Sequence, residues 1–339
     1  MSSPVRQLFG TDGIRGEAGR YPLDAETVLR LGQAAADVFL SLRSESSATH
    51  EWPTVVIGKD TRQSGDMLEA AIAAGLNSRG IDVRLAGVIP TPAVALLTRE
   101  TGAAFGVVIS ASHNPFGDNG VKFFGPDGYK LDDAVELAIE RRLLAERVDP
   151  PKEPLGSAQI GRTGPLEHAA DRYIAAVRAT VHDDRELFKG FKFALDAANG
   201  AASETSEAIL RGLGAEVVPF FKLPNGLNIN RDCGCTHAEV IAGLVRETGA
   251  HAGIAHDGDA DRVLLCDETG SVLDGDELMA IGAVDLLERG ELAGETLVAT
   301  VMSNAGLDVT LAAHGGKVVR AKVGDRYVME EMRRGDFNF

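Results

Sequence analysis

Cysteine is scarce in this sequence, and long apolar stretches are missing from it. The 339 residues include only three cysteines, Cys233, Cys235 and Cys266, and so sparse and odd a set favours a reducing compartment over a disulfide framework. No stretch reaches the ~18 apolar residues of a membrane span, and the opening residues MSSPVRQLFGTDGIRG lack the apolar core of a signal peptide. We therefore expect a cytoplasmic protein.

Net positive charge and the common nucleotide-binding motifs are missing as well. The formal net charge is −16, which disfavours a nucleic acid or an anionic membrane as the main partner, so an anionic ligand needs a local cluster of basic groups. No GxxxxGK[ST] or GxGxxG sequence occurs, so roles with ATP or NAD lose their usual support. We expect a small-molecule partner; the sequence does not distinguish a monomer from a homodimer.

What the sequence does contain is a repeated α/β pattern. With 44% hydrophobic and 25% charged residues, the chain can build proper cores. The order strand, helix, strand, helix, strand recurs, with helix caps such as Asp24 and glycines at helix ends. We predict three similar α/β units around a central cleft, the third incomplete: residues 1–150, 151–262 and 263–339, with residues 149–165 as a polar linker.

Each unit ends its third strand in a polar loop. These are the serine loop SASHNP (residues 110–115), the acidic loop DGDADR (residues 257–262) and the third loop VGDR (residues 323–326). Ligand sites in α/β sheets favour the carboxyl ends of strands, where loops and helix N-termini converge. Our hypothesis is that the three loops face one shared cleft.

The acidic loop is the strongest candidate for a metal site. Asp257, Asp259 and Asp261 alternate after an apolar strand, and carboxylates without histidine or cysteine suit a hard cation, Mg²⁺ above Mn²⁺ or Ca²⁺. An EF-hand loop requires glycine at the position of Arg262 and a helix after it, whereas Val263 begins an apolar, strand-like run. A phosphatase with an aspartate nucleophile and a solvated acidic turn remain alternatives.

The serine loop offers a candidate for carrying a phosphoryl group. A Ser-His hydrolase is disfavoured because His113 directly follows Ser112 and no Gly-x-Ser-x-Gly elbow surrounds the serine. A phosphoryl group on Ser112 would instead be stabilised by Asn114, by backbone N–H groups and by Mg²⁺ from the acidic loop. Plain turn chemistry is the alternative, and Ser110 is the weaker of the two serines.

Basic residues complete the set of candidates. Arg15 lies in GTDGIRG, where flanking glycines let the backbone approach a ligand closely. Lys122, flanked by apolar residues, either has a lowered pKa and transfers protons or is a surface lysine. Lys322 and Arg326 flank the third loop and are candidates for binding substrate. The CGCTH stretch provides at most three zinc ligands, so we interpret it as a glycine-containing loop.

Taken together, these motifs resemble a known family. GTDGIRG, ISASHNP, DNGVKFF, DGDADR and VGDRYVMEEMRRG, in this order, are similar to the α-D-phosphohexomutase superfamily. The stretch GLNINRDCGCTH (Gly226–His237) resembles its bacterial phosphoglucosamine mutase branch, although Cys235 stands where that pattern often has serine. The resemblance extends from Leu8 to about Gly335.

The resemblance implies a fold and an activity. It implies four domains around a cleft, the first three alike, so we expect the sugar-recognition loop and the fourth domain to lie beyond Phe339, with this chain truncated. It implies an isomerase, an intramolecular phosphotransferase that interconverts glucosamine 6-phosphate and glucosamine 1-phosphate. The implied cofactors are one Mg²⁺ per chain and a hexosamine 1,6-bisphosphate intermediate. The product leads toward UDP-N-acetylglucosamine and peptidoglycan.

The resemblance also implies roles for individual residues. Ser112 matches the phosphoserine, and with its phosphate Asp257, Asp259 and Asp261 match the Mg²⁺ ligands. The remaining matches are Arg15 and Lys122 for proton transfer or charge stabilisation, Arg262 for charge neutralisation, and His113 and Asn114 for shaping the site. Phosphomannomutase or phosphoglucomutase activity, or a non-catalytic sugar-phosphate-binding remnant, are the alternative functions.

Overall fold

The computed structural model describes residues 7–10, 12–44, 53–145, 155–181 and 186–339, and the side chains of residues 43 and 44 are not described. It divides into two compact units, Met1–Gly270 and Ser271–Phe339. Each unit is described here by itself. No described helix is both long and apolar enough to cross a membrane.

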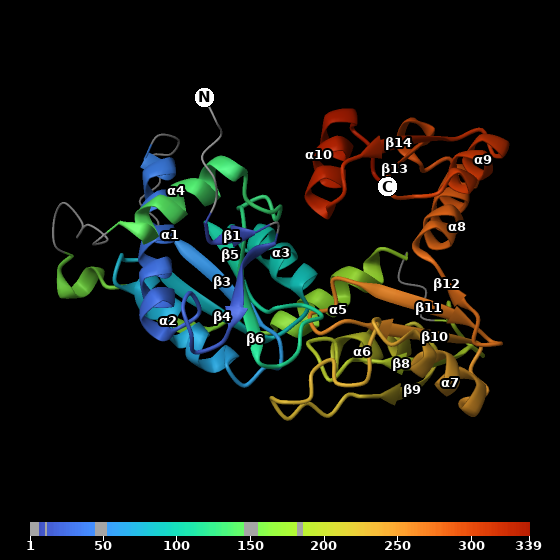
Figure 1. The fold of residues 1–339 in the computed structure, drawn as a ribbon, viewed down its shortest axis with the longest axis horizontal. Coiled ribbons are helices and arrows are strands. Elements are labelled where there is room, and N and C mark those ends of the chain that lie inside the picture. Colours follow the sequence, from blue (N-terminus) through green and yellow to red (C-terminus); the bar gives the residue numbers. More distant parts are fainter. Residues whose placement is uncertain (1–6, 11, 45–52, 146–154, 182–185) are drawn as a thin grey trace. The chain divides into compact units, whose positions relative to one another are not determined.

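A mixed seven-stranded sheet organises the first part of the larger unit (Figure 1). Its spatial order is β1-β2-β6-β5-β3-β4-β7, and β3, β4 and β5 run parallel. The strands are β1 (Phe9–Gly10), β2 (Gly13–Glu17), β3 (Thr54–Lys59), β4 (Asp82–Val88), β5 (Phe105–Ile109), β6 (Asp118–Phe124) and β7 (Thr163–Pro165). The helices are α1 (Ala25–Ser44), α2 (Gly65–Asn77), α3 (Thr91–Glu100), α4 (Asp133–Leu144) and α5 (Ala169–Ala179).

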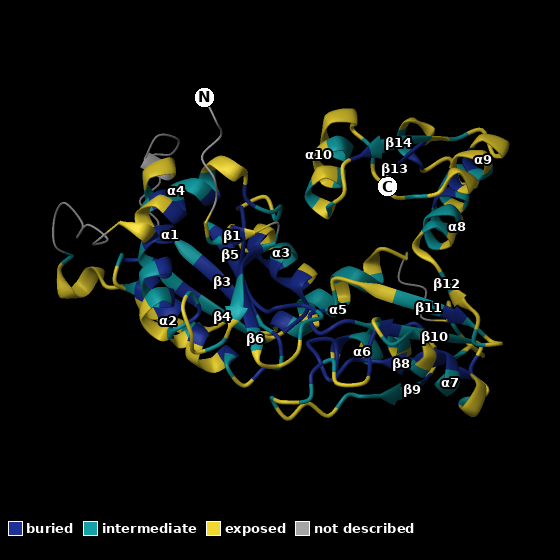
Figure 2. Cartoon of the chain, in the orientation of Figure 1, coloured by how far each residue is buried: buried dark blue, intermediate teal, exposed yellow. Residues whose placement is uncertain are grey.

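Helices cover both faces of this sheet, which explains its continuous apolar strands. Val55 and Ile57 pack into a core with α1, α2 and α4, whereas Val56, between them, packs with α3 and α5 on the other face. Successive side chains of a strand point to opposite faces, so a strand covered on both sides is apolar throughout. Figure 2 shows these strands buried and the outer helix surfaces exposed. Asp24 caps α1 as expected, accepting a hydrogen bond from the Thr27 amide at 2.9 Å.

Part of the predicted linker belongs to the first sheet. Residues 146–154 lie outside the described residues, but Thr163–Pro165 forms β7 and pairs with β4. Ala169 and Tyr173 of α5 then pack in the core around α3. The interpretation of residues 149–165 as a linker was therefore wrong at its end, because a three-residue edge strand shows no periodicity.

A five-stranded sheet, in the order β12-β11-β10-β8-β9, forms the rest of the larger unit, except that its edge strand β12 comes just after Gly270. Its elements are β8 (Lys192–Asp196), α6 (Thr205–Gly212), β9 (Glu216–Phe220), α7 (Ala238–Thr248), β10 (Ala252–His256), β11 (Val263–Asp267) and β12 (Val272–Leu273). A separate 3-10 turn, Ser157–Gln159, precedes β7 of the first sheet. The predicted boundary at residue 263 differs from the structure, because β11 pairs antiparallel with β10 along its whole length. The apolar run after the acidic loop thus closes the second sheet.

The smaller unit is an α/β layer of its own. Its elements are α8 (Gly275–Glu288), a 3-10 turn (Ala293–Glu295), β13 (Thr296–Thr300), α9 (Ala305–Ala313), β14 (Lys317–Ala321) and α10 (Asp325–Gly335). β13 and β14 pair in parallel, and Leu297 and Ala299 pack with α8 and α9. A reciprocal hydrogen-bonded cap, Asp274 with Glu277, begins α8. The predicted α/β class and its three repeats are confirmed.

Candidate active site

The serine loop places Ser112 in a buried and strained position. The serine loop begins where the buried strand β5 ends, and the Ser112 residue is 1% exposed. Its φ of 54° lies in the left-handed region that non-glycine residues rarely adopt. The Ser112 hydroxyl donates to Asp257 Oδ2 at 2.5 Å. The serine loop and the acidic loop therefore meet, as predicted for these two loops.

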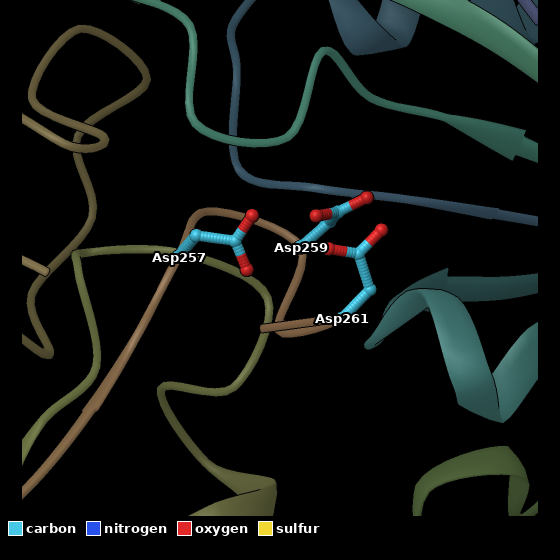
Figure 3. Close-up of side chains that lie close together, drawn as sticks. All are labelled: Asp257, Asp259 and Asp261. Atoms are coloured by element: carbon cyan, nitrogen blue, oxygen red, sulfur yellow. The ribbon is translucent and has the colours of Figure 1, made fainter. Parts of the chain in front are cut away.

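The acidic loop turns tightly between β10 and β11, with Ala260 at a φ of 53°. Asp257, Asp259 and Asp261 each direct a carboxylate oxygen into one space, and these atoms lie within 4.8 Å of one another (Figure 3). Asp257 and Asp259 are each 1% exposed. The loop therefore concentrates three carboxylates beside the serine hydroxyl.

The carboxylates perturb one another's protonation. Burial, together with the charges of Asp259 and Asp261, raises the pKa of Asp257 from its usual 3.8 to about 7. Burial and the Asp259 charge likewise raise the pKa of Asp261. Burial also acts to raise the pKa of Asp259, but the Lys122 ammonium outweighs this effect and lowers it. Such a cluster favours any cation that enters it.

The donor set of the acidic loop fits a hard metal ion. Asp259 Oδ2 is held by the Thr91 hydroxyl at 2.6 Å and by Lys122 Nζ at 2.9 Å. Asp259 Oδ1 is buried and has no hydrogen-bond partner in the part of the chain that the structure describes. A buried oxygen without a partner is costly, and oxygen-only ligands suit hard cations. The acidic triad can thus hold a metal ion through Asp257, Asp259 and Asp261.

Lys122 lies in this cluster, but its charge state differs from the prediction. Its side chain is 2% exposed, and Nζ lies 2.9 Å from both Asp12 Oδ2 and Asp259 Oδ2. Burial lowers the pKa of Lys122, but the carboxylates of Asp259, Asp261 and Asp12 outweigh it, so the pKa is raised. Both alternatives for Lys122 were therefore wrong: its pKa is raised rather than lowered, and its side chain is buried rather than at the surface. The reason is that Nζ lies among carboxylates supplied by distant parts of the chain.

Three further predicted residues surround Ser112. His113 Nδ1 lies 3.4 Å from the Ser112 hydroxyl and 3.2 Å from Arg262 Nη1. Burial and the charges of Arg262 and Arg15 lower the pKa of His113, which makes it a poor cation. Arg15 Nη1 donates to the Ala111 carbonyl at 3.3 Å, and its other terminal nitrogen pairs with Asp12. The Arg262 side chain is 54% exposed, and its Nε lies 4.0 Å from Asp261 Oδ1.

The third loop belongs to the smaller unit. Lys322 follows β14, and its Nζ lies 5.6 Å from the centre of the Tyr327 ring. Arg326 is in the first turn of α10, where Nε donates to Glu330 at 3.2 Å. Both remain candidates for binding substrate.

Several residues of the site were missed by sequence reasoning. They are Asp12, which pairs with Arg15, Lys122 and Lys130; Thr91, which holds Asp259; and Asn230, which donates to the Ser112 carbonyl at 2.8 Å. Arg62, discussed below, stands out in the sequence as a basic residue of KDTR after a strand, but the sequence gives it no role. The signal for its role is that β3 and β5 are parallel neighbours whose ends share one edge. Asn230 lies in the stretch Gly226–His237 that had been singled out on other grounds.

Two alternative readings of the sequence are resolved. An EF-hand is excluded because Val263 begins a strand rather than a helix. The CGCTH stretch forms no zinc cluster: among the described residues, the only group of at least three potential metal ligands is the acidic triad. Cys233 and Cys235 are free, and burial raises the pKa of each thiol, to about 12 and about 11.

Comparison with known families decides where the chain belongs. Residues 6–148, 171–270 and 274–339 match alpha/beta/alpha domains I, II and III of phosphoglucomutase/phosphomannomutase. The chain belongs to this family. Its members are phosphosugar mutases. The match to domain III begins at residue 274, after β12, which agrees with the pairing of β12 in the second sheet.

Within this family, the chain is similar to several phosphoglucosamine mutases. The chain is 49% identical over 334 residues to the phosphoglucosamine mutase of Pelobacter propionicus, covering 98% of this chain and 72% of that protein. It is 50% identical over 336 residues to that of Caulobacter vibrioides, again covering 98% and 72%.

Solved structures share the fold. A phosphoglucomutase/phosphomannomutase family protein of Burkholderia thailandensis matches with a TM-score of 0.80 at 25% identity, over 96% of this chain and 69% of that one. The N-acetylphosphoglucosamine mutase of Aspergillus fumigatus, in complex with GlcNAc-6P and magnesium, matches with a TM-score of 0.60 at 18% identity, over 97% and 65%.

Proposed function

We propose that this protein interconverts glucosamine 6-phosphate and glucosamine 1-phosphate, with Ser112 as the phosphoryl carrier. The observation that carries the proposal is the buried Ser112 hydroxyl, 2.5 Å from Asp257 in a carboxylate triad. Phosphoglucosamine mutase activity is the function of the relatives at about half identity. A mutase of GlcNAc-6P with magnesium shares the fold, which supports a sugar phosphate as substrate.

In the proposed reaction the bond between phosphorus and Ser112 Oγ breaks while a bond to the free sugar hydroxyl forms. The proton of that hydroxyl is balanced by the proton that Ser112 Oγ regains. A hexosamine 1,6-bisphosphate results, and its other phosphate returns to Ser112 after the sugar turns around. Asp257, as acceptor of the Ser112 hydrogen bond, orients the oxygen for this return.

The charged residues around Ser112 suit this transfer. Lys122, protonated because three carboxylates raise its pKa, acts as a fixed positive charge rather than as a base. Arg15 and Arg262 approach the serine loop from two sides and balance charge on the transferring group. Asp257, Asp259 and Asp261 would hold Mg²⁺, which when bound neutralises the phosphoryl oxygens. His113 and Asn114 shape the surroundings of the serine.

We also propose a role for the smaller unit and a place for the reaction in the cell. Lys322 and Arg326 would bind the sugar phosphate. The reaction would take place in the cytoplasm and supply UDP-N-acetylglucosamine and peptidoglycan synthesis. Phosphomannomutase or phosphoglucomutase activity is the second candidate, since the matched family is named for these enzymes.

A mass measurement tests the proposal. The protein is incubated with Mg²⁺ and glucose 1,6-bisphosphate, and its intact mass and the peptide Ala104–Lys122 are measured. We expect one added phosphoryl group on Ser112, and its transfer to glucosamine 6-phosphate in preference to the glucose and mannose phosphates. Phosphorylation elsewhere, or none at all, would contradict the carrier role; a preference for another sugar would favour the second candidate.

A further inference from the structure

The guanidinium of Arg62 uses every hydrogen-bond donor it has inside the larger unit. Its side chain is fully buried and forms an ion pair of 2.9 Å with Asp60, also fully buried. Its four remaining N–H groups donate to the backbone carbonyls of Ser112, Asn114, Pro115 and Asp118. A guanidinium has five N–H donors in a fixed planar fork, so none is left for a ligand.

Asp60 and Arg62 together hold both sides of Ser112. The Ser110 hydroxyl donates to Asp60 Oδ2 at 2.6 Å and accepts from the Ser112 amide at 2.9 Å. On the other side, Arg62 Nη2 donates to the Ser112 carbonyl at 2.9 Å. The peptide groups that flank the strained Cα of Ser112 are therefore tied to one buried ion pair.

This arrangement fixes the position of Ser112 without adding a net charge beside it. The opposite charges of Arg62 and Asp60 cancel at short range. Within the described residues, no hydrogen bond or ion pair joins Arg62 to the Ser112 hydroxyl or to the acidic triad. A non-glycine residue keeps a positive φ only where several surrounding contacts hold its backbone in that conformation. The four carbonyl bonds and the Ser110 bridge provide that constraint.

We propose that Arg62, paired with Asp60, is a positioning residue that keeps the Ser112 hydroxyl directed toward the acidic triad. The inference rests on the proposed function for its kinetic consequence, but its structural part stands alone. Lysine at position 62 would keep the charge but offer only three donors from a single point, so most of the carbonyl bonds would be lost.

The experiment compares Arg62→Lys with Arg79→Lys, a matched control. Arg79 forms an ion pair of 3.1 Å with Asp37 of α1, and its side chain is 7% exposed, so the control also replaces a buried, ion-paired arginine by lysine. The rate of Ser112 phosphorylation is measured against the concentration of glucose 1,6-bisphosphate with Mg²⁺. We expect Arg62→Lys to lower the maximal rate about 100-fold, as a displaced reacting group does, with the half-saturating concentration unchanged. Arg79→Lys should leave both unchanged.

Hydrogen exchange supplies a measurement that does not depend on the reaction. In Arg62→Lys the amides of residues 110–118 should exchange faster than in the wild type, while the rest of the chain matches Arg79→Lys. Ser110→Ala, which removes only the bridge to the Ser112 amide, should give a smaller change of the same kind and serves if Arg62→Lys does not fold.

The outcomes separate the two proposals. Faster local exchange in a protein whose wild type takes up no phosphate would support the positioning role and reject the proposed function. Normal phosphorylation with unchanged exchange in the variants, or exchange that rises evenly along the whole chain, would overturn the positioning role.

Discussion

The serine loop and the acidic loop meet at one site, but different forces hold them. In the serine loop, backbone carbonyls are satisfied by the buried, charge-balanced pair of Asp60 and Arg62. In the acidic loop, three carboxylates crowd together, and Asp259 Oδ1 lacks a partner within the described chain. Protein groups thus complete the serine loop, whereas the acidic loop, even with Lys122 beside it, keeps a buried oxygen that a cation can bind. A fixed hydroxyl beside carboxylates that can hold a metal ion suits the group transfer proposed above.

The largest expected effect removes the group that the serine loop presents. Ser112→Ala should abolish phosphoryl transfer completely, since no other hydroxyl donates to Asp257 in the described residues. The fold and metal binding should persist because alanine is smaller. Phosphate uptake from glucose 1,6-bisphosphate, read by intact mass, checks this, and residual uptake at the wild-type level would refute the carrier role.

The next effect removes a ligand from the acidic loop. Asp259→Asn should weaken Mg²⁺ binding by at least about 100-fold, because an amide carries no charge and even residues behind the ligands matter tenfold to 100-fold. Isothermal titration provides the affinity. Asp66→Asn is the control, since the Asp66 carboxylate is 84% exposed and lies outside the triad. Equal affinities in the two variants would rule out the triad as the metal site.

A third change tests how closely the two loops pack. A Cβ added at Gly258 would lie 2.7 Å from the Ser112 carbonyl oxygen and 2.8 Å from Asn230 Nδ2. Gly258→Ala should therefore destabilise the larger unit by about 2 kcal/mol, as overpacking does, and slow phosphorylation. Gly243→Ala in α7, where a Cβ meets nothing within 4 Å, is the control and should be neutral or stabilising. Denaturant unfolding of both variants gives the comparison.

A fourth prediction concerns pH and distinguishes the acidic loop, where three carboxylates crowd together, from the serine loop, where the charges of Asp60 and Arg62 balance. In metal-free protein the folded-state pKa of Asp257 is about 7, above the usual 3.8. The folded state then keeps a proton that the unfolded chain releases, so the free energy of unfolding falls as pH rises from about 4 to about 7. Apparent Mg²⁺ affinity should rise over the same interval, by up to about tenfold per pH unit. Asp257→Asn should flatten both curves; unchanged slopes would argue against the raised pKa.

The elements that sequence reasoning predicted well are those with local causes. The Asp24 cap, the apolar strand β5 and the end of α7 at Gly249 follow from residues close in the chain. The weak points were short or non-local. β7 has only three residues, and β11 joins the second sheet through pairing with β10, which no local pattern reveals.

The same division holds at the site. The sequence by itself determined which chemical groups are present, because residue type and spacing supply the carboxylates of the acidic loop and the serine hydroxyl at the end of a strand. Only the tertiary structure decided that Lys122 is a cation among carboxylates and that the Arg62 guanidinium donates to backbone carbonyls of the serine loop. The physical reason is that a pKa or a hydrogen bond depends on neighbours in space, and here those neighbours come from segments more than 50 residues apart in the sequence.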